Sequence, residues 1–422
     1  MSVASVTPVK LVCVLASTYL AAVLFARAIA SRDPGSWFFD PRTAYEASYT
    51  KIRQTKAEII IDKANTSTFS RPRGREEKVK IPRMCVGILS VAREPRYLDA
   101  TLGSLLDGLA TNEREELHIL ALLPHSDPMR HSAYREPWLH NLVDEVIHYN
   151  ISTAQSGHIT DLEREGAPFR EKGLFDYGWL LDTCLDKTDA PYIAIFEDDI
   201  IAASDWYRQT LAGLASVELK LSRGFDQARN FLYLRLFYTE QFLGWNSEDS
   251  LEHGLWSVSL VGTSWIMLLC ARLWHARMKR LFMSKVAIVA CVSAAPLAVI
   301  LFFAVGKITM LPLSPGVIMM NKYGCCSQGL VFPRATAQDL VSWFQESRIG
   351  FVDVLIEKYG DKHPDKDRFA LVPPAIQHVG RRSSKDASLH KPLAEGLSAA
   401  EHGVLSSKSA CQSREPSSGN AA

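Results

Sequence analysis

The residues best suited to chemistry in this sequence are three consecutive acids, Glu197, Asp198 and Asp199, which follow an apolar run directly. That run, Tyr192–Phe196, has the length and composition of a buried strand, so the acids would lie at the carboxyl edge of a sheet, where open α/β folds bind ligands. Because side chains alternate along a strand, Glu197 and Asp199 would point one way and Asp198 the other. Two oxygen ligands on one face suit Mn²⁺ or Mg²⁺ bridging a diphosphate, although a solvated turn would also use acids.

Three further segments could complete a site around these acids. Arg93–Tyr97 joins an apolar strand to a helix, and the N-terminus of that helix could receive a nucleotide. Lys172–Gly178 opens the helix before the acid strand. Late in the chain, His378 follows a diproline, and a neutral imidazole there could complete a metal site. A lone histidine is also compatible with an ordinary hydrogen-bonded or surface position.

Strands and helices alternate on both sides of the acids, which predicts an α/β fold with a mostly parallel sheet. Strands are expected at 84–91, 117–123, 143–149, 192–196, 230–237, 316–320 and 329–332, and a terminal strand or loop at 373–380. Helices are expected at 42–63, 97–109, 173–185, 204–215, 336–346 and 351–359.

Three uncharged runs, 11–26, 255–271 and 286–306, interrupt this pattern. With a few flanking residues each reaches the length that crosses a hydrocarbon core of about 30 Å, and the last two have no polar face. The segment 272–285 between them is basic and contains no acid, so it is expected on the cytoplasmic side, with both flanking polar regions opposite. The first run is compatible with a cleavable signal peptide, but the later spans need a topological partner, which favours an uncleaved anchor.

These features predict one catalytic domain split by a membrane hairpin. The expected divisions are a cytosolic tail at 1–10, an anchor at 11–30, a stem at 31–80, a first domain part at 81–254, spans at 255–271 and 286–306, a cytosolic loop at 272–285, a second domain part at 307–380 and a disordered tail at 381–422.

Composition excludes several classes of protein. The 422 residues carry 47 basic and 46 acidic side chains, and a net charge of +1 argues against a nucleic-acid protein held by a basic face. The mean hydropathy near zero averages the polar regions with the three runs. Spans without a charged residue provide neither a pathway nor a coupling site for a transporter.

The eight cysteines fall into two groups. Those inside the spans, Cys13, Cys270 and Cys291, are expected to be packing residues. Disulfides are permitted for the other five, Cys85, Cys184, Cys325, Cys326 and Cys411, whose spacing matches no zinc pattern. The adjacent pair at 325–326 could bond to each other or elsewhere.

The order of these pieces resembles a GT-A glycosyltransferase: a strand with Arg-Glu-Pro-Arg-Tyr-Leu, then Lys-Gly-Leu-Phe-Asp-Tyr, then Glu-Asp-Asp, then Gln-His-Val-Gly. With a hairpin inside this fold, the chain resembles the post-GPI-attachment N-acetylgalactosaminyltransferase family of the Golgi. The resemblance covers about residues 10–380. The resemblance implies UDP-GalNAc as donor, Mn²⁺ (or Mg²⁺) as the metal, and the first mannose of protein-linked GPI anchors as acceptor. It also implies a multi-pass Golgi protein with a lumenal catalytic domain.

Carried onto this chain, the resemblance makes Glu197, Asp198 and Asp199 the acids that bind the donor, and Asp199 the most direct metal contact. Glu197 replaces the family's usual Asp, which leaves its role open between a metal ligand and a ribose contact. Arg93 would lie near the uridine and Ser327 with Gln328 near the donor sugar, while His378 would be a further metal ligand.

An inverting transfer needs one base on the acceptor hydroxyl. Asp353, which opens a helix, is the first candidate, and Glu240, Glu248 and Asp249 are alternatives. Two other functions stay open at this point: a GT-A transferase using another donor, such as UDP-GlcNAc on N-glycans, and a non-catalytic receptor that carries GPI proteins.

Overall fold

The protein is described from a computed structural model. It covers residues 8–33, 35–40, 50–66, 81–149, 153–164, 169–223, 229–237, 244–245, 247–274, 285–320 and 326–380. The chain divides into two compact units. One contains residues 1–47 and 239–313, and the other contains residues 48–238 and 314–422. We call them the membrane unit and the α/β unit.

The α/β unit is built on an eight-stranded mixed sheet with the strand order β3-β2-β1-β4-β8-β6-β9-β7. Its strands are β1 (Met84–Leu89), β2 (Leu117–Leu122), β3 (Glu145–Ile147), β4 (Tyr192–Glu197), β6 (Asn230–Arg235), β7 (Gly316–Met319), β8 (Gly329–Pro333) and β9 (Lys366–Val372). The strands β3, β2, β1 and β4 are parallel, and β8 pairs antiparallel with both β4 and β6. Since β4 precedes the hairpin and β8 follows it, the predicted α/β fold split by a hairpin is confirmed.

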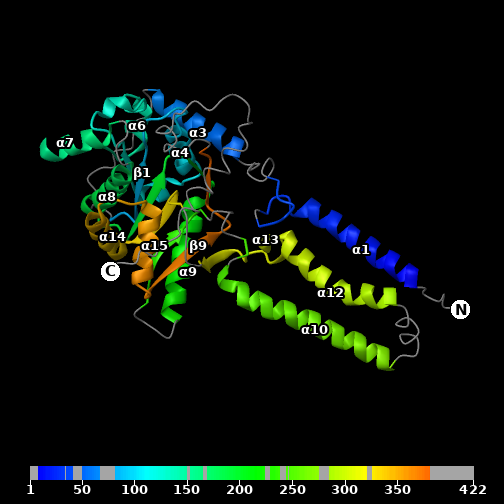
Figure 1. The fold of residues 1–422 in the computed structure, drawn as a ribbon. Coiled ribbons are helices and arrows are strands. Elements are labelled where there is room, and N and C mark those ends of the chain that lie inside the picture. The colour runs from blue at the N-terminus through cyan, green and yellow to red at the C-terminus, as the bar shows by residue number, and fades with distance from the viewer. Residues whose placement is uncertain are drawn as a thin grey trace. The chain divides into compact units, whose positions relative to one another are not determined.

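Helices cover both faces of this sheet (Figure 1). One face carries α3 (Thr50–Asn65), α4 (Leu98–Leu106), α6 (Pro137–Leu142) and α9 (Trp206–Arg223). The other carries α8 (Phe169–Lys187), α14 (Arg334–Ser347) and α15 (Val352–Lys362). The shorter α5 (Thr111–Glu115) and α7 (Thr153–Leu162) complete the unit. The alternation of side chains along β1 divides its residues between the two cores, with Val86 in one and Cys85 in the other.

One expected stem segment belongs to the α/β unit instead. Helix α3 buries Ala57, Ile61 and Ala64 against this unit, and Gly103 of α4 lies so close to Ala57 that an added Cβ would be 2.7 Å from its Cβ. The helix was expected in the stem because its weak apolar pattern resembles that of a solvated segment.

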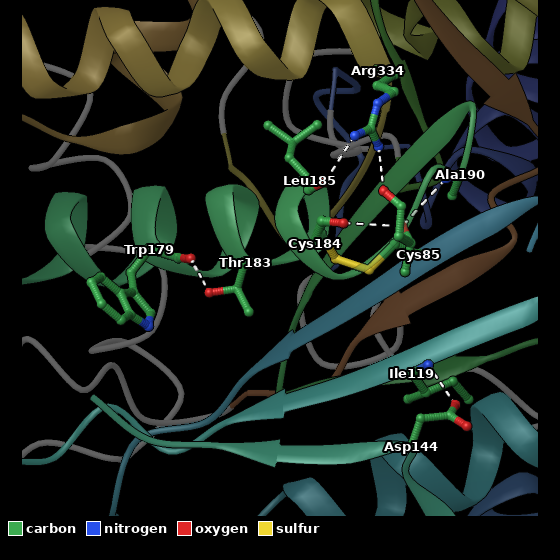
Figure 2. Close-up of a disulfide and its surroundings, with 10 residues drawn as sticks. Cys85, Ile119, Asp144, Trp179, Thr183, Cys184, Leu185, Ala190 and Arg334 are labelled. Carbon is green, nitrogen blue, oxygen red and sulfur yellow. Dashed lines mark hydrogen bonds between the residues drawn. A yellow bond between two sulfur atoms is a disulfide. The ribbon is translucent and has the colours of Figure 1, made fainter. Parts of the chain in front are cut away.

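A disulfide between Cys85 of β1 and Cys184 of α8 fastens one helical layer to the sheet (Figure 2). The end of α8 is tied down further by Arg334, whose guanidinium donates to the carbonyls of Leu185 and Thr188 at 2.8 and 2.6 Å. Of the other three cysteines expected to permit disulfides, 325 and 411 lie outside the described residues, and Cys326 lies within them.

Three helices form the body of the membrane unit: α1 (Pro8–Ile29), α10 (Ser250–Trp274) and α12 (Lys285–Val305), followed by the short α13 (Lys307–Met310). All three are long and apolar enough to cross a membrane, and their side chains are largely exposed in the protein itself. They lie side by side in Figure 1, with α12 packed against both α1 and α10.

Two strands, β9 and β5 (Ile200–Ala202), were not predicted, and β10 (Ile376–His378) lies in the segment 373–380, which was expected as a strand or a loop. β9 reads as a charged loop because its first three residues, Lys366–Arg368, are all ionised. The second sheet pairs β5 with β10, and three-residue strands leave no periodic signal.

Candidate functional site

The three acids lie at the carboxyl end of β4, as predicted. β4 ends at Glu197 and β5 begins at Ile200, so Asp198 and Asp199 form the turn between two strands. Thr101 of α4 holds this turn, because its hydroxyl lies 2.5 Å from the carbonyl oxygen of Asp198 and accepts a hydrogen bond from the backbone N–H of Ile200. The turn is therefore fixed by a helix of the fold.

Asp198 is held by a chain of hydrogen bonds from the strand beside it. The Ser90 hydroxyl, directly after β1, donates to Asp198 Oδ2 at 2.6 Å, and His131 Nε2 lies 3.0 Å from Ser90 Oγ. His131 Nδ1 accepts from the N–H of Ala133, so the ring proton lies on Nε2 and is donated to Ser90. Arg93 forms an ion pair with Asp198 from the other side.

Burial sets the direction of the pKa shifts of Asp198 and His131 in this chain of hydrogen bonds. It raises the pKa of Asp198 to about 6, although Arg93 and the Ser90 hydroxyl both favour the carboxylate. Burial also lowers the pKa of His131 to about 4, and the charge of Arg96 acts in the same direction. His131 is thus a neutral donor at physiological pH, as its hydrogen bonds require.

Asp199 faces the last strand of the unit. β10 pairs with β5 so that His378 lies opposite Ile200, and the N–H of Val379 donates to the carbonyl of Asp199 at 2.8 Å. His378 Nε2 lies 3.3 Å from Asp199 Oδ2, and Arg93 Nη2 lies 3.1 Å from the same oxygen. Gly380 allows this approach, since an added Cβ would overlap Asp199 Oδ2 and lie 2.8 Å from His378 Nε2.

The pKa values of this pair move apart. Burial works against both charges, but the hydrogen bond to Asp199 and the charges of Asp199 and Glu197 raise the pKa of His378 above its ordinary value. Burial is likewise outweighed at Asp199, where His378 and Arg93 lower the pKa of the carboxyl. Each partner therefore favours the charged form of the other.

Glu197 meets the segment that follows the hairpin. Ser327 Oγ donates to Glu197 Oε1 at 2.6 Å, and the carbonyl of Gln328 accepts from the N–H of Glu197. The side-chain oxygen Oε1 of Gln328 is buried and has no hydrogen-bond partner among the described residues. Ser327 and Gln328 thus lie at the acid edge, and their place near the donor sugar stays a prediction.

The donor set fits a divalent cation shared with a diphosphate. Asp199 Oδ1 is buried and has no hydrogen-bond partner in the described part of the chain, and the imidazole of His378 lies beside the other oxygen of the same carboxylate. No group of three or more His, Cys, Asp or Glu side chains with metal-binding geometry occurs among the described residues. Mg²⁺ in nucleotide sites is commonly held by one or two carboxylates and substrate phosphates, so two protein ligands suffice.

The candidate bases are placed unequally. Asp353 lies at the start of α15, where its Oδ2 accepts from the N–H of Cys326 at 3.1 Å and Oδ1 from the N–H of Val354 at 2.9 Å. Its partner Cys326 directly precedes Ser327, whose hydroxyl donates to Glu197. Glu240 lies outside the described residues, and only the backbone of Glu248 is described. Asp249 pairs with Lys307 in the membrane unit at 3.2 Å.

Sequence reasoning missed Ser90, Thr101 and His131. Ser90 lies near the carboxyl end of the strand predicted at 84–91, and that position was a usable signal because such ends share one edge with the acids. His131 gave no signal, since only the fold brings it to Ser90.

A second polar cluster lies on the segment Lys172–Gly178. Lys172 Nζ contacts both oxygens of Asp176 at 2.7 and 2.8 Å and the Tyr149 hydroxyl at 2.6 Å. Burial raises the pKa of Asp176 to about 6 against the opposing charge of Lys172. Tyr149 also packs against Phe175 and Trp179, so this segment presents an aromatic and charged cluster from α8.

Comparison with known protein families identifies one family that matches this chain. A family model described as GPI-N-acetylgalactosamine transferase PGAP4 matches residues 84–376, which contain both parts of the sheet, the acid turn and the two hairpin helices. No curated protein matches the chain significantly.

Proposed function

The chain belongs to the GPI-N-acetylgalactosamine transferase PGAP4 family, and from this premise we propose that it transfers N-acetylgalactosamine from UDP-GalNAc to the first mannose of protein-linked GPI anchors. The family is one of glycosyltransferases. The proposal adds the donor, the acceptor sugar, inversion at the anomeric carbon and dependence on Mn²⁺ or Mg²⁺.

The observation that carries the proposal is the buried, unpartnered Oδ1 of Asp199 beside His378 at the carboxyl edge of the sheet. A buried carboxylate oxygen without a partner is costly, so its retention needs a reason. A donor diphosphate with its cation would supply the missing partner. When bound, such a cation would stabilise negative charge on the departing diphosphate.

The residues of this chain would divide the remaining work. Arg93 forms ion pairs with both Asp198 and Asp199, so its guanidinium group is held at the edge where a diphosphate would lie. Gln328 would offer its free amide oxygen to the donor sugar. In the transfer, the acceptor hydroxyl attacks the anomeric carbon as the bond to UDP breaks, and Asp353 is the proposed acceptor of the hydroxyl proton.

The proposed location is the Golgi membrane, with the α/β unit in the lumen. Three helices of membrane-spanning length support a multi-pass protein. The Cys85–Cys184 disulfide supports an oxidising compartment for the α/β unit, because disulfides are rare in the cytosol.

The test is UDP release by the detergent-solubilised full-length protein with a GPI-mannose acceptor and either UDP-GalNAc or UDP-GlcNAc. We expect turnover with UDP-GalNAc that requires Mn²⁺ or Mg²⁺ and is lost on chelation. Equal turnover with both donors, or none with UDP-GalNAc, would overturn the proposed donor.

A matched pair of variants tests the site. Asp199→Ala should lower kcat/KM by about 10²–10⁴-fold, because transition-state charge stabilisation by such a group has that magnitude. Asp205→Ala, an exposed acid six residues further on, should change it little. Full function of Asp199→Ala would favour a non-catalytic receptor instead.

A further inference from the structure

The membrane unit contains a large apolar cleft that the proposed chemistry does not use. It has a volume of about 1500 Å³ and is lined mostly by apolar side chains, which come from α1, α10, α12 and the residues Met310 and Leu311 that follow them. Pockets for drug-sized ligands are about 300–1000 Å³, so this cleft is larger than such a ligand needs. Its walls belong to helices that can cross a membrane, which places it at the depth of lipid chains.

Helix α12 lies between the other two walls of the cleft and packs against both α1 and α10. Pro296 has no N–H, so the carbonyl of Val292, four residues earlier, loses its helical donor. Trp265 Nε1 from α10 donates to that carbonyl at 3.0 Å, and the Tyr19 hydroxyl from α1 donates to the carbonyl of Leu297 at 3.3 Å. Both outer helices are therefore bonded to α12 at its proline, so the cleft lies between walls that are held in register.

One end of the bundle is also fastened. The last carbonyls of α12 lack helical donors, and Trp245 Nε1 donates to Phe303 at 3.0 Å while Ser36 Oγ donates to Ala304 at 3.0 Å. Beyond it, Asp33 accepts from the N–H of Thr309 at 2.9 Å. This is the end at which the chain passes to the α/β unit, since residues 314 onward belong to that unit.

The cleft opens toward that end. Its lining on α10 runs only from Glu252 to Thr263, in the first half of the helix, so three walls exist for about 17 Å at 1.5 Å per residue. That depth is about half of a hydrocarbon core of roughly 30 Å, or one leaflet. The polar side chains Glu252 and His253 stand at its mouth.

We propose that this cleft binds an acyl chain of the lipid that anchors the acceptor, so that the enzyme recognises the lipid as well as the glycan of its substrate. The proposal rests on the proposed function, because only a lipid-anchored acceptor has such a chain. The part of the cleft that all three helices wall lies in the leaflet next to the end from which the chain enters the α/β unit, and the lipid of an acceptor presented to that unit occupies the same leaflet. Its open side is continuous with the exposed apolar faces of the helices, through which a chain could enter from the bilayer.

Two adjacent alanines of α1 provide a matched test. Ala22 lines the cleft, whereas Ala21 is exposed and does not. Each is replaced by Trp in the full-length protein, and KM is measured for an intact GPI-anchored acceptor and for the same acceptor after phospholipase C has removed its diacylglycerol. The acceptor without lipid reports on the catalytic site and on folding.

We expect wild type to bind the intact acceptor at least about tenfold more tightly by KM, a ratio equivalent to about 1.4 kcal/mol. Ala22→Trp should remove most of this preference with unchanged kcat/KM on the cleaved acceptor, and Ala21→Trp should keep it. Equal preference in the two variants would overturn the cleft proposal and leave the transferase proposal standing. No turnover of either acceptor by wild type would instead refute the transferase proposal, and the cleft proposal with it.

A second measurement uses no substitution. An intact acceptor with a photoreactive diazirine in its acyl chain should label wild type at cleft positions such as Leu15, Leu260 and Ala294. Labelling confined to outward-facing residues such as Val14 and Val289, or a crosslink between two copies of the chain, would contradict occupation by the acceptor lipid.

Discussion

The two units of this protein use polar side chains in opposite ways. In the α/β unit, buried charges bind one another: Glu357 accepts from the Tyr233 hydroxyl at 2.6 Å and from Arg368 Nε at 2.7 Å, with Arg235 at 3.8 Å. In the membrane unit, polar side chains such as Trp265 bind backbone carbonyls.

The difference follows from the solvent of each unit. A water-soluble fold can bury a charge where a counter-charge and hydrogen bonds compensate its lost hydration. A helix in hydrocarbon must satisfy its backbone internally, so its polar side chains serve carbonyls that the helix leaves free. Removing a buried charge from the α/β unit should therefore cost much unfolding free energy, and removing a side-chain donor from the membrane unit should cost little.

The largest effect is expected from Glu357→Gln in the α/β unit. The variant removes the buried carboxylate charge that Glu357 supplies to Arg235 and Arg368, and breaking a buried ion pair costs about 3–5 kcal/mol of unfolding free energy. Denaturant unfolding of the solubilised protein measures this loss. Asp361→Asn removes a partner of Arg368 that is 46% exposed and should cost under about 1 kcal/mol. Similar losses in the two variants would show that burial does not set the cost.

The next effect depends on pH and concerns His131. Its pKa is lowered to about 4 in the folded protein, so its contribution to stability is present above about pH 6.5 and is lost as pH falls toward 4. At pH 5 the loss is about 2 kcal/mol, at 1.36 kcal/mol per pKa unit. His131→Gln keeps a donor for Ser90 and cannot titrate, so its stability should fall less than that of wild type between pH 7 and pH 5.

The raised pKa of Asp198, about 6, acts in the opposite direction and is present in both proteins. Its contribution is favourable at low pH and is lost as pH rises through about 6. The comparison of wild type with His131→Gln largely cancels this contribution. Equal acid sensitivity of the two proteins would mean that His131 is not the group that resists protonation.

A smaller effect is expected on activity from Ser90→Ala, which removes the hydroxyl between His131 and Asp198. Groups that orient site carboxylates typically contribute about 10–100-fold, so kcat/KM should fall by that factor. UDP release measures the change. Ser216→Ala, on the exposed side of α9, is the control, and an equal fall there would contradict a role in orienting the acids.

Most of the fold could be predicted from the sequence because its strands and helices are long and periodic. The short strand β5 could not, since three residues carry no period, and for the same reason β10 was left open between a strand and a loop. The pairing of these two strands brings His378 to Asp199. Helix α3 was expected in the stem. Its contact with α4 depends on Gly103, a residue remote in the sequence, so no local pattern indicated that this helix belongs to the α/β unit.

The part of the site that depends on one segment of the sequence could be predicted, and the contacts between remote segments could not. Glu197, Asp198 and Asp199 follow a clear strand, and strand ends of a parallel sheet share an edge. Arg93 was predicted in the same site, near the uridine, but its ion pairs with Asp198 and Asp199 were not predicted, because these partners lie more than 100 residues away in the sequence. His131 was invisible for the same reason.

The smallest effect is expected in the membrane unit and tests the comparison most sharply. Trp265→Phe removes the donor to the Val292 carbonyl, and hydrogen bonds between membrane helices contribute only about 0.6 kcal/mol on average. Pro296→Ala restores an N–H that can reach the same carbonyl from within α12. On that background Trp265→Phe should therefore cost less than in the wild type, and a double-mutant cycle on unfolding in detergent isolates the difference. Equal costs on both backgrounds would mean that Trp265 contributes by packing alone, and that this unit does not use side chains to replace missing backbone donors.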